Sequence, residues 1–223
     1  MRVHAAAGLA VCATLLGGCT LLHSSAPLEQ TYYLRAAPAE GDVAAPPADA
    51  PSLRVARPLT APGLDTVHIV LVQADHRMNF YTGSRWPAPL ADVVEALMLQ
   101  TMRASGNWSS VEGSTSGFPT NYLLQCSVRR FEADYTAGGS APSAQVVLDC
   151  LIGRREGREV LATFSVTGSA AAAANRMSDV VAAFEQASRS ALAALSQQVF
   201  AAARTDREHA AQNGAKPDAS ISR

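Results

Sequence analysis

Two segments with helical periodicity limit the folds open to this chain more than any other feature. In residues 90–102 and 177–199, apolar side chains recur at steps of three and four, so a helix there would carry one apolar stripe. The first stripe contains Leu90, Val93, Val94, Leu97, Met98, Thr101 and Met102. The second contains Met177, Val181, Phe184, Ser188, Ala191, Leu192, Leu195 and Val199. Each stripe must be buried, which requires a sheet or another helix beside it.

The remaining periodic segments are typical of strands. Residues 66–73 are almost continuously β-branched, as in the centre of a sheet. Further strands are predicted at 31–35, 52–59, 78–81, 108–111, 122–135, 144–154 and 160–168. The last three form an antiparallel meander with turns at 137–140 and 155–158. The pattern predicts an α+β fold in which two amphipathic helices pack on one face of a single, mostly antiparallel sheet.

Length and charge exclude some classes of protein. The chain has 223 residues, of which 48% are hydrophobic and 17% charged, as expected for one globular domain. Its formal net charge is −1, and Lys216 is its only lysine. Nucleic-acid binding is therefore not expected, because it requires clustered cations. We predict a domain over 30–204 and a disordered tail over 205–223, where the composition becomes polar.

The N-terminus has the features of a lipoprotein export signal. Arg2 precedes an apolar run over residues 5–16 that is too short to span a bilayer permanently. The sequence over 16–19, Leu-Gly-Gly-Cys, resembles a bacterial lipobox, which implies a signal peptide over 1–18 and lipidation of Cys19. Residues 19–29 would form the lipidated tether. Thr20 stands where an aspartate would favour inner-membrane retention, so we expect the periplasmic face of the outer membrane.

Two cysteines remain in the exported domain. Cys126 and Cys150 lie in predicted strands at equal distances from residue 138 in the turn, so a hairpin would place them opposite each other. An oxidising periplasm permits a disulfide between them. The alternative is two buried thiols on the core face, and the sequence does not distinguish the two.

The segment 77–106 joins an aromatic strand to the first helix through what we interpret as a Gly-Ser-Arg-Trp-Pro turn. Phe80, Tyr81 and Trp86 lie within seven residues, although aromatics make up only 6% of the chain. Aromatic residues beside arginine are enriched at binding surfaces. One interpretation is a partner-binding surface formed by Tyr81, Arg85 and Trp86. The other is a structural corner in which Trp86 fills the space between helix and sheet.

No arrangement of catalytic or metal-binding residues is found in the sequence. The histidines lack metal-ligand spacing, and there is no nucleophile elbow, phosphate-binding glycine loop or Cys-x-x-Cys pair. We therefore expect no enzymatic activity, no metal and no cofactor.

Several motifs together resemble the ABC-type transport auxiliary lipoprotein family. They are the lipobox at Cys19, Tyr-Tyr-Leu at 32–34, Ala-Pro-Gly-Leu-Asp at 61–65, Asn-Phe-Tyr-Thr-Gly-Ser-Arg-Trp at 79–86 followed by Pro-Leu at 89–90, and Tyr-Leu-Leu at 122–124. The resemblance covers roughly residues 32–199. Cys126, Cys150 and the Ala/Pro-rich loop after the first strand are departures from the family pattern.

The resemblance implies a non-catalytic docking component of an intermembrane lipid or hydrophobic-solute transport system. Its partner would be an MCE-domain protein, contacted through Tyr81, Arg85 and Trp86. The alternative is a periplasmic lipid carrier that holds an acyl chain between sheet and helices. The sequence does not reveal the oligomeric state, although a symmetric ring of copies would suit a docking collar.

Overall fold

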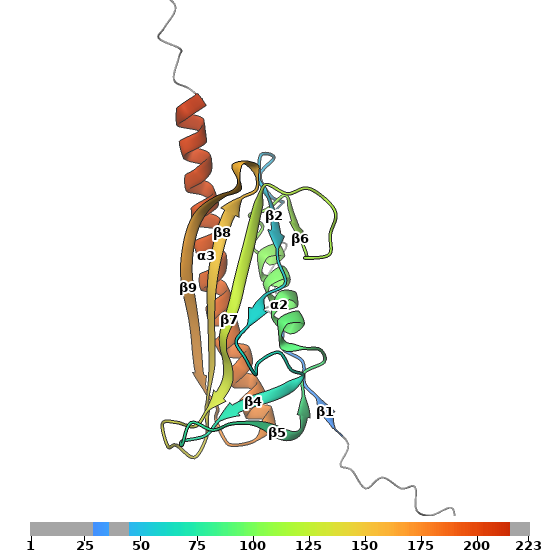
Figure 1. Ribbon diagram of the computed structural model, residues 1–223, viewed down its shortest axis with the longest axis vertical. Helices are drawn as coiled ribbons and strands as arrows, with labels where there is room; N and C mark the ends of the chain where they lie inside the picture. The colour runs from blue at the N-terminus through green and yellow to red at the C-terminus, as the bar shows by residue number, and fades with distance from the viewer. Residues whose placement is uncertain (1–28, 36–44, 215–223) are drawn as a thin grey trace, which may run out of the picture.

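Nine strands form one mixed, mostly antiparallel sheet in the computed structural model, which describes residues 29–35 and 45–214 (Figure 1). The strands are β1 (Gln30–Thr31), β2 (Ser52–Val55), β3 (Leu59–Thr60), β4 (His68–Val72), β5 (Met78–Arg85), β6 (Ser110–Glu112), β7 (Tyr122–Asp134), β8 (Ser143–Arg154) and β9 (Glu159–Ala171). The predicted signal peptide, Cys19 and most of the tether lie outside the described residues. The α+β architecture predicted from the sequence is confirmed.

Strand β7 organises the sheet. On one side it pairs antiparallel with β8, and β8 pairs antiparallel with β9, so the predicted meander is confirmed. On its other side β7 pairs in parallel with three short strands, β2, β3 and β4, placed one after another along its length. These parallel pairs make the sheet mixed.

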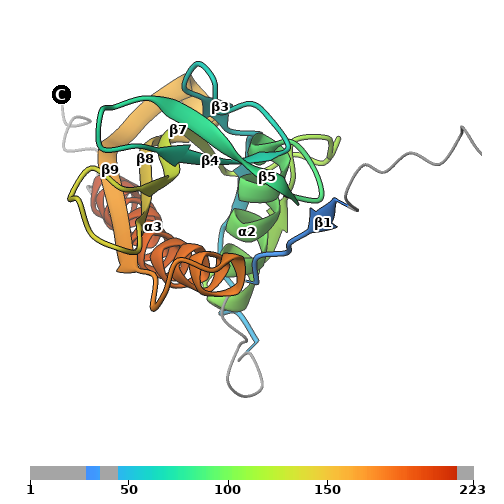
Figure 2. The ribbon, with the colours of Figure 1, turned by 90° about the horizontal axis from the view of Figure 1, so that it is seen from below.

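Two helices, α2 (Leu90–Ala104) and α3 (Met177–Gly214), pack on the same side of the curved sheet (Figure 2). Both predicted stripes face the core, with Thr101 and Met177 only half-buried. Helix α2 begins directly after Pro89, where a missing amide hydrogen costs little. It ends at Ala104, Ser105 caps it, and Gly106 follows in the left-handed conformation with φ of 67°.

Helix α3 is longer than the sequence analysis predicted. A disordered tail from residue 205 is wrong for residues 205–214, because α3 continues to Gly214 and projects beyond the sheet (Figure 1). The Asp206 carboxylate accepts hydrogen bonds from the Tyr122 hydroxyl at 3.0 Å and from Nη1 of Arg154 at 3.0 Å. These contacts with the end of the sheet stabilise turns whose composition is too polar to predict a packed helix. Residues 215–223 lie outside the described part.

The predicted turn after residue 81 is also wrong. Strand β5 continues through residues 82–84 to Arg85, because strands pair with it on both sides. On one side β4 places His68 opposite Arg85, and on the other β1 places Gln30 and Thr31 opposite Ser84 and Arg85. The chain turns only after Trp86.

The core between sheet and helices is filled at its centre by three aromatic rings. Trp86 meets Phe131 and Phe184 edge-to-face at centroid distances of 6.0 and 5.4 Å, and Phe131 stacks on Phe184 at 5.1 Å. Farther along, the α3 backbone approaches β9 very closely. A Cβ atom at Gly168 would lie 1.9 Å from the carbonyl oxygen of Ala187, so this contact requires glycine.

Candidate functional site

The three residues expected to bind a partner occupy three different environments. Trp86 is only 1% exposed, and its backbone amide donates to the Val67 carbonyl at 2.7 Å. It fills the space between helix and sheet, so the interpretation of Trp86 as a structural corner is confirmed. A partner-binding role for Trp86 is corrected, because its ring is enclosed by the core.

Tyr81 is half-buried and joins three segments of the chain. Its hydroxyl lies 2.8 Å from that of Tyr135, and the Tyr135 hydroxyl donates to Oδ1 of Asn175 at 2.7 Å. Burial, and then the hydrogen bond with Tyr135, raise the pKa of Tyr81 above its usual value, so its hydroxyl stays neutral. Tyr81 therefore ties β5 to the end of β7 and to the segment before α3.

Arg85 is engaged with the start of the domain. Its Nη1 donates to Oε2 of Glu29 at 3.2 Å, and the backbone carbonyl of Arg85 accepts from the amide of Tyr32 at 2.9 Å. Nδ1 of His68 lies 4.0 Å from the other oxygen of Glu29. Arg85 thus holds residues 29–32 against strand β5, where the chain first enters the sheet.

An exposed patch lies on the same strands, and the sequence analysis did not identify it. Met78 and Phe80 are 45% and 46% exposed, and the Phe80 ring lies 5.4 Å from the ring of His68. We call His68, Met78 and Phe80 the β4–β5 patch. Strand alternation was the signal that could have found it, because Phe80 and Tyr81 must point to opposite faces.

The two cysteines face each other as the hairpin predicted. Cys126 and Cys150 are register partners on β7 and β8, and the structure joins them by a disulfide with a Cα–Cα distance of 4.1 Å. Both side chains belong to the core cluster. The disulfide therefore links two long adjacent strands near the middle of their ladder.

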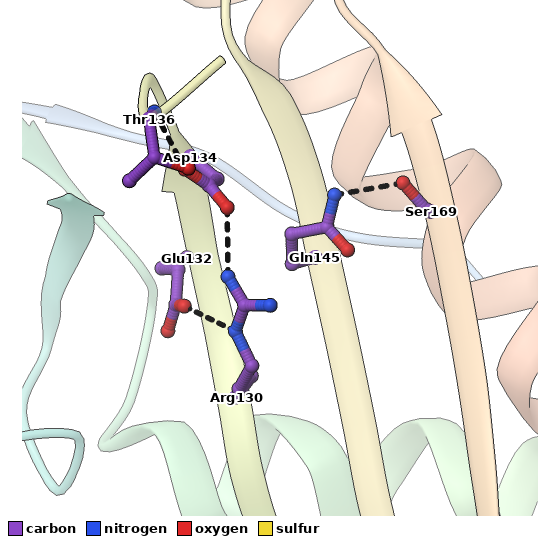
Figure 3. A network of polar contacts seen from close by, with 6 residues as sticks. All are labelled: Arg130, Glu132, Asp134, Thr136, Gln145 and Ser169. Carbon is purple, nitrogen blue, oxygen red and sulfur yellow. Dashed lines mark hydrogen bonds and ion pairs between the residues drawn. The ribbon is translucent and has the colours of Figure 1, made fainter. Parts of the chain in front are cut away.

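A polar network occupies the sheet face opposite the helices, which we call the outer face (Figure 3). Arg130 donates from Nε to Glu132 at 2.6 Å and from Nη2 to Asp134 at 2.8 Å, while the Thr136 amide donates to Asp134 at 2.7 Å. Next to it, Gln145 donates to the Ser169 hydroxyl at 2.8 Å. The charged groups satisfy one another, so the network stabilises the outer face and offers no free catalytic group.

The core between the helices and the sheet is closely packed around Phe131, Ser188 and Leu192. The cavity between the helices and the sheet measures about 10 Å³, enough for at most one water molecule. Across residues 29–35 and 45–214, no cluster of three His, Cys, Asp or Glu side chains is arranged to hold a metal ion. None of the described helices has the length and apolarity needed to cross a membrane.

Comparison with known proteins identifies the family. Residues 32–199 match the family model described as the ABC-type transport auxiliary lipoprotein component. This match covers most of the chain, so the protein belongs to that family and is an auxiliary lipoprotein component of ABC-type transport. Comparison with curated proteins gives no match.

Two solved structures share the fold, and a third is more weakly similar. The crystal structure of XCC0632 from Xanthomonas campestris is 25% identical, with a TM-score of 0.67 over 78% of this chain and 95% of that one. An uncharacterized protein is 11% identical, with a TM-score of 0.61 over 78% of this chain and 99% of that one. The PelC dodecamer from Paraburkholderia phytofirmans is 13% identical, with a TM-score of 0.40 over 70% and 91%.

Proposed function

We propose that this protein is anchored to the periplasmic face of the outer membrane through Cys19 and docks an MCE-type transport assembly there, without catalysing a reaction. The family match over residues 32–199 carries this proposal. Intermembrane transport of lipids or other hydrophobic molecules would require a component fixed at the receiving membrane. A lipid-anchored domain with a filled core meets that requirement.

The β4–β5 patch is the surface we assign to docking. It combines two exposed apolar side chains with an imidazole. Arg85 links β5 to Glu29, and Tyr81 links β5 to Tyr135. Exposed aromatic and methionine side chains supply large contact areas at low entropic cost. Tyr81 and Arg85 then act by positioning the patch.

The position of the patch relative to the anchor supports the same role. Glu29 lies beside β5 through its contact with Arg85, and Cys19 is ten residues earlier in the chain. Ten extended residues reach at most about 36 Å. The proposed anchor would therefore hold the patch near the membrane, where a partner that spans the periplasm must end.

The carrier alternative receives no support from the interior. An acyl chain between sheet and helices would need a cavity of a few hundred Å³, typical of ligand pockets. The cavity found there measures about 10 Å³. Docking is therefore the function that the geometry favours.

Co-purification tests the docking surface. Membranes containing the full-length protein with Met78→Ser and Phe80→Ser should yield at least about tenfold less MCE-domain protein, because two apolar contacts are lost. Phe118→Ser is the matched control, since Phe118 is 73% exposed in the segment between β6 and β7. Equal recovery from the double variant and the control would refute the assignment of the patch.

A further inference from the structure

An open groove crosses the outer face at the end of the sheet remote from β1. One part of it is a hollow of about 330 Å³ that Gly153 helps to line. Gly153 pairs with Leu123 on one side and Val160 on the other, and a β-bulge between β8 and β9 begins beside it. A Cβ atom at Gly153 would lie 3.0 Å from the Glu159 carbonyl oxygen, so glycine lets the β9 backbone come close at this point.

The groove continues diagonally toward β3 as a second hollow of about 490 Å³, which shares Gln125 and Leu151 with the first. Apolar side chains border the combined groove. They are Leu59, Leu123, Leu151 and Val160, of which Leu59 is 73% and Val160 58% exposed. A groove with apolar walls of this exposure is unusual on the outer side of a sheet, where polar residues normally face water.

Arginines line both ends of the groove, but Arg57 at the β3 end is already paired with Asp65 and Asp92. Arg155 and Arg158 line the hollow over Gly153, and neither makes an ion pair within residues 29–35 and 45–214. Arg154 beside them is already paired with Glu159 and Asp206. Glu156, in the same turn, lines a separate polar hollow.

The backbone of Arg158 has a conformation that is energetically unfavourable for arginine. Its φ is +54°, a left-handed conformation in which glycine or asparagine is favoured over arginine. The turn thus holds an arginine where a smaller residue would relieve strain, and aims positive charge at the end of the groove.

The length of the groove fits one acyl chain. Leu59 lies opposite Ser127, and Gly153 lies opposite Leu123, four residues away on β7. With a rise of ~3.4 Å per residue and strands ~4.8 Å apart, the diagonal from Gly153 to Leu59 is about 17 Å. The hydrocarbon core of a bilayer is ~30 Å thick, so a chain from one leaflet extends about 15 Å.

We propose that this groove binds one acyl chain of a phospholipid, with the phosphate held by Arg155 and Arg158. Charge-assisted hydrogen bonds from arginine suit a phosphate, and the apolar walls suit the chain. The proposal rests on the proposed transport function and deepens it, since it names the molecule that this domain contacts. It differs from the carrier alternative because the lipid lies outside the core.

Photo-crosslinking in cells tests it on the full-length, membrane-anchored protein. A benzophenone-bearing amino acid replaces Leu59 or Leu151 in cells whose phospholipids carry radioactive phosphate. Ultraviolet light should then transfer label to a band at the mass of the protein. The acyl anchor proposed at Cys19 contains no phosphorus, so it adds no background. Thr167, exposed on the outer face in β9, is the control position.

A double variant tests the headgroup. With Arg155→Gln and Arg158→Asn, label at Leu151 should fall about tenfold, the loss expected for charge-assisted hydrogen bonds. Asparagine at 158 suits the left-handed backbone, so folding should not suffer. Arg189→Gln with Arg204→Gln is the matched control on α3, and it should leave the label unchanged.

Four outcomes would overturn the proposal: no label at Leu59 or Leu151, equal label at Thr167, label that survives the double arginine variant, or a crosslinked band of higher mass without phosphorus. The last would show that a protein covers the groove. Failure of the docking proposal is read separately, from recovery of the MCE-domain protein with the Met78 and Phe80 variants.

Discussion

The two faces of the sheet differ in how closely their side chains are packed. On the helix side, the Trp86, Phe131 and Phe184 rings meet at a filled centre, and α3 touches β9 without space for a single methyl group at Gly168. On the outer face, a self-satisfied polar network lies near one end of β7 and an open apolar groove near the other. Packing is thus tightest on the covered face, whereas the outer face keeps an open groove beside its polar network.

Truncation of one aromatic from each environment should show the largest difference. Trp86→Ala removes a fully buried ring and should lower the free energy of unfolding by about 3–5 kcal/mol. Phe80→Ala removes a half-exposed ring and should cost less than about 1 kcal/mol. Urea unfolding of both variants measures this, and similar losses would contradict the comparison.

A single methyl group should break the contact between α3 and β9. Gly168→Ala places a Cβ against the Ala187 carbonyl, so the helix must shift, at a cost of about 1–3 kcal/mol or more. Gly117→Ala is the matched control because nothing lies within 4 Å of its added Cβ. Thermal unfolding should show a clear loss for the first variant only; an unchanged melting temperature for Gly168→Ala would mean that the helix packs more loosely than the structure shows.

The polar network should show a smaller, pH-dependent effect. Burial opposes ionisation of Asp134, but hydrogen bonds from Thr136 and Arg130 outweigh it and hold the pKa of Asp134 below its usual value. A carboxyl group whose pKa is lowered by folding stabilises the native state above its unfolded pKa of about 3.9, and this contribution is lost as the pH falls through the native pKa.

Asp134→Asn should therefore lower stability at neutral pH and flatten the loss of stability in acid below about pH 4. Chemical unfolding at several pH values measures both changes. Asp65→Asn is the control, because Asp65 is exposed and lies 3.8 Å from Arg57 in its ion pair. The same acid profile in Asp134→Asn and the unmodified protein would exclude a role for the network.

Periodicity was sufficient to predict most of the fold. The two helical stripes, the meander of β7 to β9 and the facing cysteines all follow from spacing of three to four or two residues along the chain, and the structure confirms them. Strand β5 and the end of α3 could not be predicted this way. Both depend on partners distant in sequence: β1 for the end of β5, and the contact of Asp206 with Tyr122 and Arg154 for α3.

The binding surfaces were harder to predict than the fold. Aromatic density pointed to Trp86, but density does not reveal which face of a strand a ring occupies, and Trp86 is buried while Phe80 is exposed. The outer groove had no local signal. It forms because the pairing of β3, β7, β8 and β9 brings Leu59, Leu151 and Val160 to the same face of the sheet, an arrangement set by register.

Strand β1 has a mechanical consequence for any lipid anchor. It pairs with β5 over only two residues, and one ion pair between Glu29 and Arg85 reinforces it. A force applied at Cys19 would act first on the pairing of β1 with β5, and it would separate these two strands before the larger sheet is disturbed. Freeing residues 29–35 would lengthen the tether by at most about 23–25 Å, since extended chain spans ~3.3–3.6 Å per residue. Separation of β1 from β5 would let the domain follow a moving partner while the rest of the sheet stays folded.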